Sequence, residues 1–466
     1  MKIYFIGICG TAMGNGALLM RELGYEVSGS DENVYPPMSD LLQESGIGIY
    51  SGFSATNIAS AAPDLVVIGN AMSRGNIEVE HTLNARIEYI SLAELLKRLV
   101  IQGKESIVIT GTHGKTTTSS LMAWVFDYAK KKPTFLIGGV PENFHRGYQA
   151  HRDSKYVILE GDEYDTAFFD KRSKFLHYLP TTLIINNIEF DHADIFSSVE
   201  EIELAFKRCT LQVPGNGVII ANGDDHRVRG VIAHPVAPVI TVGLGKGNTI
   251  QATDIAYGES TTTFTVIREG KTLGTIELAL LGEFNVRNAL AVLAAGLHHE
   301  LAFSTIAEAM MSFRNVKRRL ELKGTYNGVT VYDDFAHHPT AIKGTLHALR
   351  TKYPGRRIIA IFEPRSNTTR RNIFQKELAE CFADADVVFM SQIARLHLLS
   401  EDERLNPEQV MADIRSKGKD AYYLQDADAI STKAAELAKP DDIVIVMSNG
   451  GFGGIHGLLQ QKLSAK

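Results

Sequence analysis

A glycine-rich turn carries the strongest chemical signal in the sequence. Residues 110–118 read Thr-Gly-Thr-His-Gly-Lys-Thr-Thr-Thr and follow an apolar run at 106–110. In such a turn the backbone N–H groups converge on a phosphate, and the helix that follows adds its positive end. A lysine at this place contacts the β- and γ-phosphates, and the next hydroxyl ligates Mg²⁺. The pattern predicts a nucleoside triphosphate site in which Lys115 and Thr116 have these roles.

This turn is shorter than the general phosphate-loop pattern, which has four residues between its glycines. Only two residues separate Gly111 from Gly114, and Ile109 stands where the earlier glycine would be. An ordinary strand–turn–helix unit with a surface lysine is the alternative interpretation. We favour the phosphate site because the apolar strand, the Gly-Lys-Thr step and the helical stretch all agree.

Two acidic segments follow apolar strands further along the chain. Residues 160–165 read Glu-Gly-Asp-Glu-Tyr-Asp, and residues 186–194 read Asn-Asn-Ile-Glu-Phe-Asp-His-Ala-Asp. The carboxyl ends of parallel strands are where α/β sheets bind ligands, and carboxylates are the hard ligands that Mg²⁺ needs. Alone, each segment could be a solvated acidic loop. Their succession beside a phosphate loop favours a metal–nucleotide site, and the Asp-His-x-Asp setting makes His192 a candidate member.

A second glycine-containing turn opens the chain at residues 7–14, Gly-Ile-Cys-Gly-Thr-Ala-Met-Gly. It invites comparison with the dinucleotide fingerprint Gly-x-Gly-x-x-Gly. Cys9 occupies the second glycine position and Ala12 the third. The second glycine normally lets the backbone approach a pyrophosphate, so a nicotinamide-dependent oxidoreductase is disfavoured.

Short apolar runs alternate with helical patterns along most of the chain, which predicts an α/β fold with parallel sheets. The expected strands lie at 2–6, 25–30, 64–69, 106–110, 156–160, 182–186, 329–332, 357–362, 387–390 and 443–447. Residues 250–280 differ, because β-rich segments flank a Glu-Gly turn and indicate an inserted antiparallel patch. We expect three domains, at 1–104, 105–317 and 318–466, in line with a size of roughly 150 residues per domain.

Composition excludes several classes of protein. The net charge of −6 argues against a non-specific nucleic-acid binder, which would carry a basic surface. The three cysteines, Cys9, Cys209 and Cys381, are far apart and show no disulfide or zinc spacing, which indicates a reducing compartment. The sequence contains neither a signal-peptide pattern nor an apolar run of about 18 residues. We therefore expect a cytoplasmic protein that binds neither nucleic acid nor membrane.

In their order along the chain these motifs resemble those of the Mur ligase family. The resemblance rests on the phosphate loop and the two acidic segments, and on two further segments. Residues 282–288 read Gly-Glu-Phe-Asn-Val-Arg-Asn, with Phe284 where the family commonly has histidine, and residues 331–340 read Val-Tyr-Asp-Asp-Phe-Ala-His-His-Pro-Thr. The resemblance covers essentially the whole chain. It implies a Rossmann-like UDP-binding domain, a central phosphate-loop ATPase domain and a C-terminal Rossmann-like domain that binds a peptide.

The resemblance implies an ATP-dependent ligase that forms an amide bond through an acyl phosphate. Two branches of the family load UDP-N-acetylmuramate directly, one with L-alanine and one with the tripeptide L-Ala-γ-D-Glu-meso-diaminopimelate during peptidoglycan recycling. The chain resembles the tripeptide branch more closely. The segments that favour this branch are 7–14, 34–39, 69–72, 363–368 and 447–456.

The resemblance also implies which residues form the site. The residues expected in catalysis are Lys115, Glu160 and His192. Those expected to hold Mg²⁺ are Thr116, Glu160 and His192. Those expected to bind ATP are Gly111, Thr112, His113, Gly114, Lys115, Thr116, Thr117, Asn285, Asn288, Arg319 and Asp334. Those expected to bind the UDP-substrate are Gly10, Thr11, Ala12, Met13, Asp31, Asn70, Ala71, Met72 and His113. Those expected to bind the peptide are Arg365 and Asn367.

Other interpretations stay open at this stage. An L-alanine-adding ligase would differ in the amine that it accepts. A phosphate-loop kinase or NTPase would transfer or hydrolyse phosphate without an amine, and a UDP-sugar binding protein would not need Lys115 and Glu160 together. Lys207 resembles a lysine that is carbamylated in some family members, but we favour an ordinary solvated helix lysine. Oligomeric state, peptide-length tolerance and the choice of diaminopimelate over lysine are not determined by the sequence.

Overall fold

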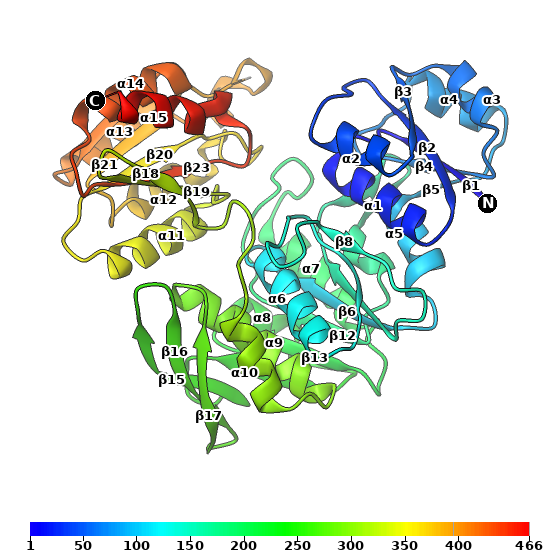
Figure 1. The fold of residues 1–466 in the computed structure, drawn as a ribbon, viewed down its shortest axis with the longest axis horizontal. Coiled ribbons are helices and arrows are strands. Elements are labelled where there is room, and N and C mark those ends of the chain that lie inside the picture. The colour runs from blue at the N-terminus through cyan, green and yellow to red at the C-terminus, as the bar shows by residue number, and fades with distance from the viewer. Residues whose placement is uncertain (395, 466) are drawn as a thin grey trace.

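The computed structural model describes residues 1–394 and 396–465. Three α/β bodies follow one another along the chain, coloured blue, cyan to green, and yellow to red in Figure 1. Each is built on its own sheet, and the strands of the three sheets fall within 1–104, 105–317 and 318–466. The expected three-domain α/β fold is therefore present, while the limits between the domains stay predictions.

The N-terminal domain is a five-stranded sheet of order β3-β2-β1-β4-β5, in which all neighbouring strands are parallel. Its strands are β1 (Lys2–Ile6), β2 (Glu26–Asp31), β3 (Gly48–Ser51), β4 (Leu65–Ile68) and β5 (Tyr89–Ser91). Its helices are α1 (Thr11–Glu22), α2 (Met38–Glu44), α3 (Ala55–Ala61), α4 (Ile77–Asn84) and α5 (Leu92–Leu96). The strand order reverses at β1, so the turn between β1 and α1 lies where such sheets bind ligands.

The central domain is a ten-stranded sheet of order β17-β16-β15-β14-β13-β12-β6-β9-β7-β8. Its strands are β6 (Glu105–Thr110), β7 (Thr134–Leu136), β8 (Tyr148–Gln149), β9 (Tyr156–Glu160), β12 (Thr182–Ile185), β13 (Val218–Asn222), β14 (Val239–Gly243), β15 (Ile250–Tyr257), β16 (Thr262–Arg268) and β17 (Lys271–Leu278). Its helices are α6 (Lys115–Tyr128), α7 (Val199–Thr210), α8 (His226–Val231), α9 (Glu283–His298) and α10 (Phe303–Met311). The β15–β17 segment is antiparallel, as expected for residues 250–280.

The phosphate loop is positioned by the middle of this sheet. Strand β6 lies between β9 and β12, and all three run parallel. Their β-branched side chains are buried on both faces, as in parallel sheets that helices cover on both sides. One face packs against α6 and α9, which lie side by side in Figure 1. The loops after β6, β9 and β12 therefore meet at one edge of the sheet.

The C-terminal domain is a six-stranded sheet of order β18-β19-β23-β20-β21-β22, parallel except for β18. Its strands are β18 (Glu321–Tyr326), β19 (Val329–Asp334), β20 (Ile358–Phe362), β21 (Val387–Ser391), β22 (Asp420–Leu424) and β23 (Ile443–Met447). Its helices are α11 (Pro339–Lys352), α12 (Gln375–Cys381), α13 (Pro407–Ser416), α14 (Ala427–Leu437) and α15 (Ile455–Ser464). Separate apolar cores lie on its two faces, as in a Rossmann-like layer.

A short hairpin joins the first two domains. Strands β10 (Asp165–Ala167) and β11 (Asp170–Ser173) form this hairpin directly after the acidic segment of β9. The Asn70 amide donates to the Asp165 carbonyl at 2.8 Å, and the rings of Tyr89 and Phe169 lie 5.1 Å apart. The N-terminal domain thus contacts the hairpin that follows the acidic segment of β9.

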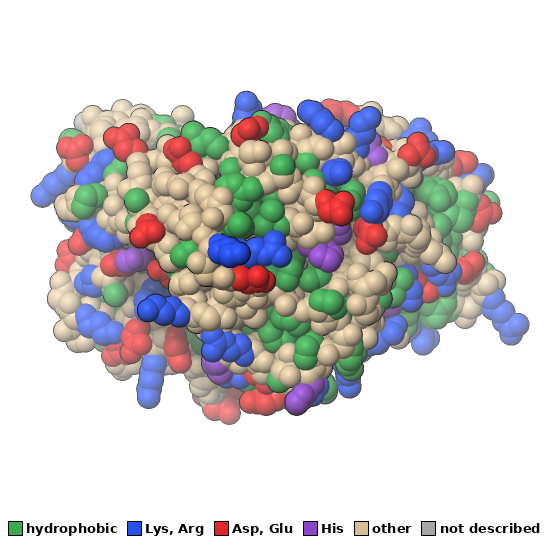
Figure 2. All heavy atoms as spheres, turned by 90° about the horizontal axis from the view of Figure 1, so that it is seen from below, with side chains coloured by type: hydrophobic (Ala, Val, Ile, Leu, Met, Phe, Trp, Pro, Cys, Tyr) green, Lys and Arg blue, Asp and Glu red, His purple; other side chains and the backbone are tan. Residues whose placement is uncertain are grey.

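Charge is distributed without strong polarity on the face shown in Figure 2, where basic and acidic side chains are interspersed. This arrangement agrees with the modest net charge of the sequence. Within residues 1–394 and 396–465, none of the helices has the length and apolar character needed to cross a membrane.

Candidate active site

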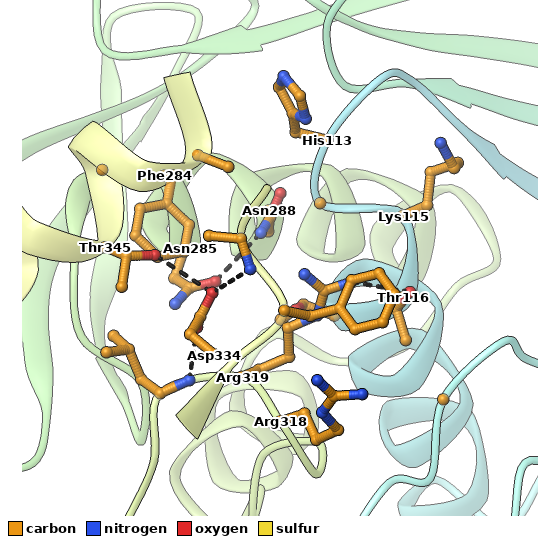
Figure 3. A pocket seen from close by; sticks show the side chains of 18 of the residues that line it. His113, Lys115, Thr116, Phe284, Asn285, Asn288, Arg318, Arg319, Asp334 and Thr345 are labelled. Carbon is orange, nitrogen blue, oxygen red and sulfur yellow. Dashed lines mark hydrogen bonds between the residues drawn. The ribbon is translucent and has the colours of Figure 1, made fainter. Parts of the chain in front are cut away.

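A cavity of about 1060 Å³ opens where the three domains meet. Thr11 and Pro37 line it from the N-terminal domain, and the phosphate loop lines it from the central domain. Arg319 and Asp334 come from the C-terminal side, as Figure 3 shows. The cavity therefore collects residues from motifs that are far apart in the sequence.

Residues outside the phosphate loop help to fix its conformation. The Asn187 carbonyl accepts the Thr112 N–H at 3.1 Å, and the Asn187 side chain accepts the His113 N–H at 2.7 Å. Gly114 has a φ of +80°, and a Cβ there would lie 2.7 Å from the Asn288 side-chain oxygen. A residue with a side chain would strain this turn and displace Asn288.

Lys115 lies beneath the loop with its ammonium group turned toward carboxylates. Its Nζ lies 2.8 Å from the nearer Glu163 oxygen and 2.8 Å from the Gly111 carbonyl oxygen. The Glu163 side chain is 2% exposed and that of Lys115 13%. Burial opposes the lysine charge, but the carboxylates led by Glu163 outweigh it and raise its pKa. Lys115 is thus held charged where the loop would receive phosphate oxygens.

Thr116 and Glu160 form the first oxygen-rich group at the base of the loop. The Thr116 hydroxyl donates to Glu160 Oε1 at 3.0 Å, and the other carboxylate oxygen accepts the Gly138 N–H at 2.9 Å. Arg319 donates to Thr116 Oγ1 at 3.3 Å. Burial raises the pKa of Glu160, and the Gly138 N–H and Lys115 only partly offset this effect. A bound cation would therefore stabilise the ionised carboxylate.

A second group lies beside the first and contains two residues outside the expected metal set. Ligand atoms of Asp162, Glu163 and His192 all lie within 4.8 Å of one another. His192 Nε2 is 3.1 Å from Glu163 Oε1. Burial opposes protonation of His192, yet Glu163 outweighs it and raises the pKa. The acidic segment was visible in the sequence, but which of its carboxylates meet Lys115 depends on the loop path after β9.

The opposite wall of the cavity holds the residues expected near the adenine. Asn288 donates to the Asn285 side chain at 3.1 Å, and Asn285 donates to the Leu281 carbonyl at 2.8 Å. Asp334 accepts the Leu320 and Ala336 N–H groups, each at 2.7 Å, and its burial raises its pKa. Hydrogen bonds within the protein therefore orient these side chains.

Phe284 supplies the apolar part of this wall (Figure 3). Its ring lies over Gly282 and Gly344, whose hypothetical Cβ atoms would be 2.7 and 3.4 Å from it. A flat apolar face bordered by amides suits a planar heterocycle. The motifs of the sequence do not assign Phe284 to the site, although its position at the start of a helix beside Asn285 is a usable signal.

The residues expected to bind the UDP-substrate are only partly gathered at the cavity. Of the described residues in that set, Thr11 and His113 line it, and the others do not. Gly10, Thr11 and Ala12 are exposed at the start of α1, whereas the Met13 side chain packs into the core. Asp31 accepts the Cys9 N–H at 2.9 Å. The remaining three residues do not face the cavity. The Asn70 side chain donates to Asp165, the Met72 side chain packs on Gly7, and Ala71 is exposed.

Arg365 and Asn367 line a smaller cavity of about 270 Å³ next to the large one. Asp191, His192 and His337 border both cavities, so the two are contiguous around the catalytic histidine candidate. The rest of its lining is polar: Tyr164, Asp194, Ser366, Thr368 and Asn449. The structure therefore places both expected peptide-binding residues beside His192.

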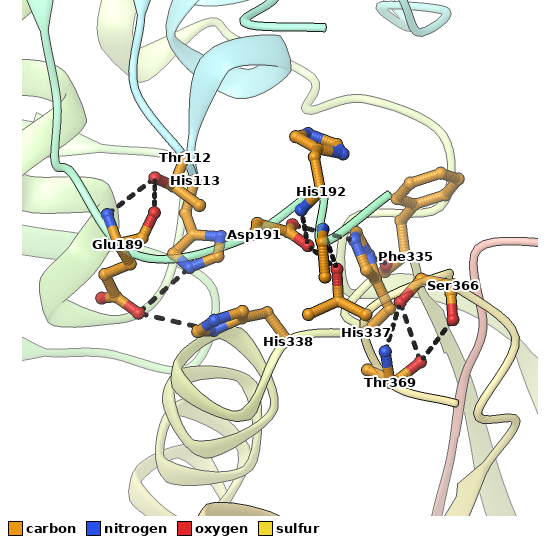
Figure 4. A network of polar contacts seen from close by, with 12 residues as sticks. Thr112, His113, Glu189, Asp191, His192, Phe335, His337, His338, Ser366 and Thr369 are labelled. Carbon is orange, nitrogen blue, oxygen red and sulfur yellow. Dashed lines mark hydrogen bonds and ion pairs between the residues drawn. The ribbon is translucent and has the colours of Figure 1, made fainter. Parts of the chain in front are cut away.

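The C-terminal domain is fastened to the second acidic segment by polar contacts, shown in Figure 4. Thr368 donates its hydroxyl to buried Asp191 at 2.7 Å, and Thr340 donates to Glu189 at 2.6 Å. His338 Nε2 lies 3.2 Å from the Phe190 carbonyl oxygen. Burial, followed by the nearby His113, lowers the pKa of His338 to about 3, so its ring is neutral.

Lys207 is exposed on α7. It is not among the described residues that line either cavity. The structure therefore agrees with a solvated helix lysine at this position.

Comparison with known proteins accounts for this arrangement. Family models match the chain at residues 2–104 (Mur ligase family, catalytic domain), 109–296 (Mur ligase middle domain) and 318–450 (Mur ligase, glutamate ligase domain). The chain is 44% identical over 468 aligned positions to the UDP-N-acetylmuramate–L-alanyl-γ-D-glutamyl-meso-2,6-diaminoheptandioate ligase of Escherichia coli, with 100% of this chain and 99% of that protein covered. It belongs to the Mur ligase family. As a member it is an ATP-dependent ligase that forms an amide bond, and the resemblance drawn from the motifs is confirmed.

Two further members of the Mur ligase family are similar to the chain. The UDP-N-acetylmuramate–L-alanine ligase of Clostridium tetani is 34% identical over 451 positions, covering 96% of this chain and 95% of that protein. The crystal structure of a murein peptide ligase from Psychrobacter arcticus 273-4 is 36% identical, with a TM-score of 0.74 and coverage of 100% and 99%. The three-domain Mur ligase fold therefore holds over the full chain.

Proposed function

We propose that the chain joins the amino group of L-Ala-γ-D-Glu-meso-diaminopimelate to the lactyl carboxylate of UDP-N-acetylmuramate, with ATP as co-substrate, during peptidoglycan recycling. The observation that carries this proposal is the full-length identity of 44% to a ligase named for that reaction. The L-alanine ligase of Clostridium tetani, the alternative within the family, is 34% identical.

The reaction proposed has two steps. A carboxylate oxygen of UDP-N-acetylmuramate attacks the γ-phosphorus of ATP, ADP leaves, and an acyl phosphate forms. The alanine amine then attacks the acyl carbon, the tetrahedral intermediate loses phosphate and a proton, and the amide remains. Both reactants of the first step are anions, so the site must first neutralise charge. Lys115, held charged by Glu163 at 2.8 Å, is the residue we assign to that task at the γ-phosphate.

Mg²⁺ fits the donors at the base of the phosphate loop. Thr116 and Glu160 offer hard oxygens 3.0 Å apart, and Asp162, Glu163 and His192 form a second candidate group. When bound, the ion would neutralise phosphate charge and favour attack at phosphorus. The protein residues orient the nucleotide around it: Arg319 and Asp334 from the C-terminal side, and Asn285 and Asn288 toward the adenine beside Phe284.

The two remaining substrates are assigned to the N-terminal and the C-terminal domain. We assign the diphosphate of the UDP-substrate to the exposed start of α1 at Gly10–Met13, where the N–H groups and helix dipole favour an anion. Asp31 and the Asn70–Met72 segment would lie toward the uridine. We assign the peptide carboxylates to Arg365 and Asn367, because the small cavity adjoins His192 and a guanidinium binds carboxylates bidentately.

We place the reaction in the cytoplasm. The three cysteines are free thiols, and Cys209 and Cys381 are buried, which suits a reducing compartment. The net charge of −6 and the mixed surface do not suit a nucleic-acid partner.

The deciding experiment measures phosphate release with ATP, Mg²⁺ and UDP-N-acetylmuramate, adding either the tripeptide or L-alanine. Release with the tripeptide alone, together with an amide product of the expected mass, would support the proposal. Release with L-alanine would move the chain to the alanine-adding branch. Release with neither amine would contradict both assignments.

A further inference from the structure

A further group of metal-ligating side chains lies outside the Mg²⁺ donors. It consists of His113 in the phosphate loop, Glu189 in the second acidic segment and His338 just before α11 (Figure 4). Ligand atoms of the three residues lie within 4.8 Å of one another. The first two belong to the central domain and the third to the C-terminal domain. Nothing in the proposed ligase reaction uses this group as a unit.

Hydrogen bonds determine which nitrogen of His338 carries the proton. Its Nε2 faces the Phe190 carbonyl oxygen at 3.2 Å, which only an N–H can satisfy. Its Nδ1 accepts the Thr340 N–H at 3.3 Å, as the cap of α11, and so carries a lone pair. A ring that donates one N–H to a backbone carbonyl and keeps a lone pair on its other nitrogen is the usual arrangement of a metal-binding histidine. A metal ion at Nδ1 would take the place of the long Thr340 N–H contact.

The unprotonated nitrogen faces an anion. His338 Nδ1 lies 3.4 Å from Glu189 Oε2, so an unprotonated ring nitrogen and a carboxylate oxygen lie close together. The His338 side chain is 4% exposed, which leaves little water to screen the contact. A cation between the two atoms could bond to both of them and would remove the repulsion between the nitrogen lone pair and the carboxylate.

The distances from Glu189 to the two histidines suit a tetrahedral ion. His113 Nε2 also lies 3.4 Å from Glu189 Oε2. Zinc bonds to imidazole and carboxylate are about 2.0–2.2 Å long, which places tetrahedral ligand atoms about 3.4 Å apart. The Thr340 hydroxyl orients the carboxylate by donating to it at 2.6 Å. His113 and Glu189 line the large cavity, so a fourth position can take water from it.

We propose that His113, Glu189 and His338 bind one Zn²⁺ ion that joins the phosphate loop to the C-terminal domain. Two imidazoles and one carboxylate favour a borderline transition metal, whereas Mg²⁺ prefers oxygen ligands. The ion bridges residues that must separate when the two domains move apart. It therefore holds the closed arrangement and slows each step that needs opening, such as product release.

Metal binding is tested on the full chain with Zn²⁺ by calorimetry and with Co²⁺ by visible absorption, in excess Mg²⁺ to occupy the oxygen-rich donors. We expect one Co²⁺ with tetrahedral d–d bands, displaced by Zn²⁺. His338→Ala and Glu189→Gln should each weaken Zn²⁺ binding at least 10-fold. Thr340→Val removes only the hydroxyl that orients Glu189 and should weaken binding about 10-fold, the lower end of the usual contribution of such an outer partner and less than the loss caused by either ligand variant. Circular dichroism confirms that each variant is folded.

His192→Ala is the matched control, because it removes a histidine from the neighbouring group of Asp162 and Glu163. The proposal requires that this variant keep the Co²⁺ bands and the Zn²⁺ affinity. Loss of binding in His192→Ala with retention in His338→Ala would overturn the proposal in favour of the neighbouring group. Absence of a tetrahedral spectrum in the folded wild-type chain would overturn it as well.

Discussion

The ammonium group of Lys115 lies 2.8 Å from the carboxylate of Glu163, a residue 48 positions further along the chain. The pair is nearly inaccessible to solvent and sits under the phosphate loop. Since ATP would bring its own negative charge to Lys115, nucleotide binding must compete with Glu163 for the same cation. We propose that Glu163 keeps the lysine charged and in place until phosphate arrives.

The first prediction concerns this pair. Glu163→Gln leaves a buried lysine without its nearest counter-charge, so the nucleotide-free protein should lose roughly 3–5 kcal/mol of unfolding free energy. ATP with Mg²⁺ should restore much of this loss, because phosphate replaces the carboxylate. Urea unfolding with and without nucleotide measures both values. Glu203→Gln, which breaks only the partly exposed pair with Arg227, is the control and should cost less than about 1 kcal/mol. Equal losses in the two variants would contradict the assigned role of Glu163.

Lys115→Ala should lower kcat by about 10²- to 10³-fold, the usual cost of removing one group that stabilises developing charge. ATP affinity should fall much less, because the loop N–H groups and the adenine wall remain. Steady-state phosphate release and equilibrium nucleotide binding separate these effects. A loss confined to ATP affinity would show that Lys115 only binds the nucleotide.

Much of this architecture could be predicted from the sequence because buried parallel strands are short apolar runs. The strands expected at 2–6, 156–160 and 443–447 are present at these positions. The position of Met13 could also have been predicted, since Thr11 and Met13 are two residues apart on one helix and cannot both face a ligand. Thr11 is exposed and Met13 is buried.

Tertiary pairings could not be predicted, because they depend on loop paths and domain placement. Nothing in residues 160–165 indicates that Glu163, rather than Glu160, pairs with Lys115. In the same way, Thr368 meets Asp191 across 177 positions and a domain boundary. Local patterns identify the chemical groups at a site, whereas the fold decides which of them touch.

The small cavity yields the third prediction. Arg365→Ala should raise the KM for the tripeptide at least 10-fold and change the KM for ATP little, because Arg365 lies with His192 and away from the adenine wall. Arg365→Lys should recover only part of the effect, since an ammonium lacks the bidentate geometry of a guanidinium. Initial rates over both substrates provide the values. Arg371→Ala, which breaks a pair with Glu403, is the control. Equal changes in both KM values would contradict the assignment of Arg365 to peptide binding.

Acid sensitivity yields the fourth prediction, through His299 at the end of α9. Burial, with the neighbouring His298, lowers the pKa of His299 to about 4. The unfolded chain titrates near 6.5, so between these values the unfolded state binds more protons. Stability from this residue is complete above pH 6.5 and is lost as pH falls toward 4, by about 1–3 kcal/mol.

His299→Gln keeps a partner for the Thr182 hydroxyl, which lies 2.9 Å from His299 Nε2, but cannot titrate. Its unfolding free energy should therefore fall less between pH 6.5 and 4 than that of the wild type. Urea unfolding at several pH values gives the two slopes. His145→Gln, at a side chain that is 72% exposed, should leave the slope unchanged. Parallel slopes for His299→Gln and the wild type would rule out His299 as the source of acid sensitivity.

The last prediction concerns the contact that connects the C-terminal domain to the second acidic segment, residues 186–194. Asp191 is buried, and its side chain accepts both the Thr368 hydroxyl and the N–H of His192 at 2.7 Å. Thr368→Val has nearly the same shape but leaves this carboxylate short of a partner, which should cost about 1–3 kcal/mol in the closed arrangement. Because the contact forms only when the domains are together, the cost should appear as a lower population of the closed enzyme.

Thr368→Val should consequently lower kcat about 10-fold or more, while nucleotide binding to the central domain alone changes little. Thr368→Ser keeps the hydroxyl and should retain most of the activity, which separates the hydrogen bond from packing. Small-angle scattering with nucleotide and UDP-substrate gives an independent measure, because the wild type and Thr368→Ser should contract more than Thr368→Val. If the serine and valine variants lose activity equally, the hydrogen bond is not what joins the domains, and packing around Thr368 must account for the effect.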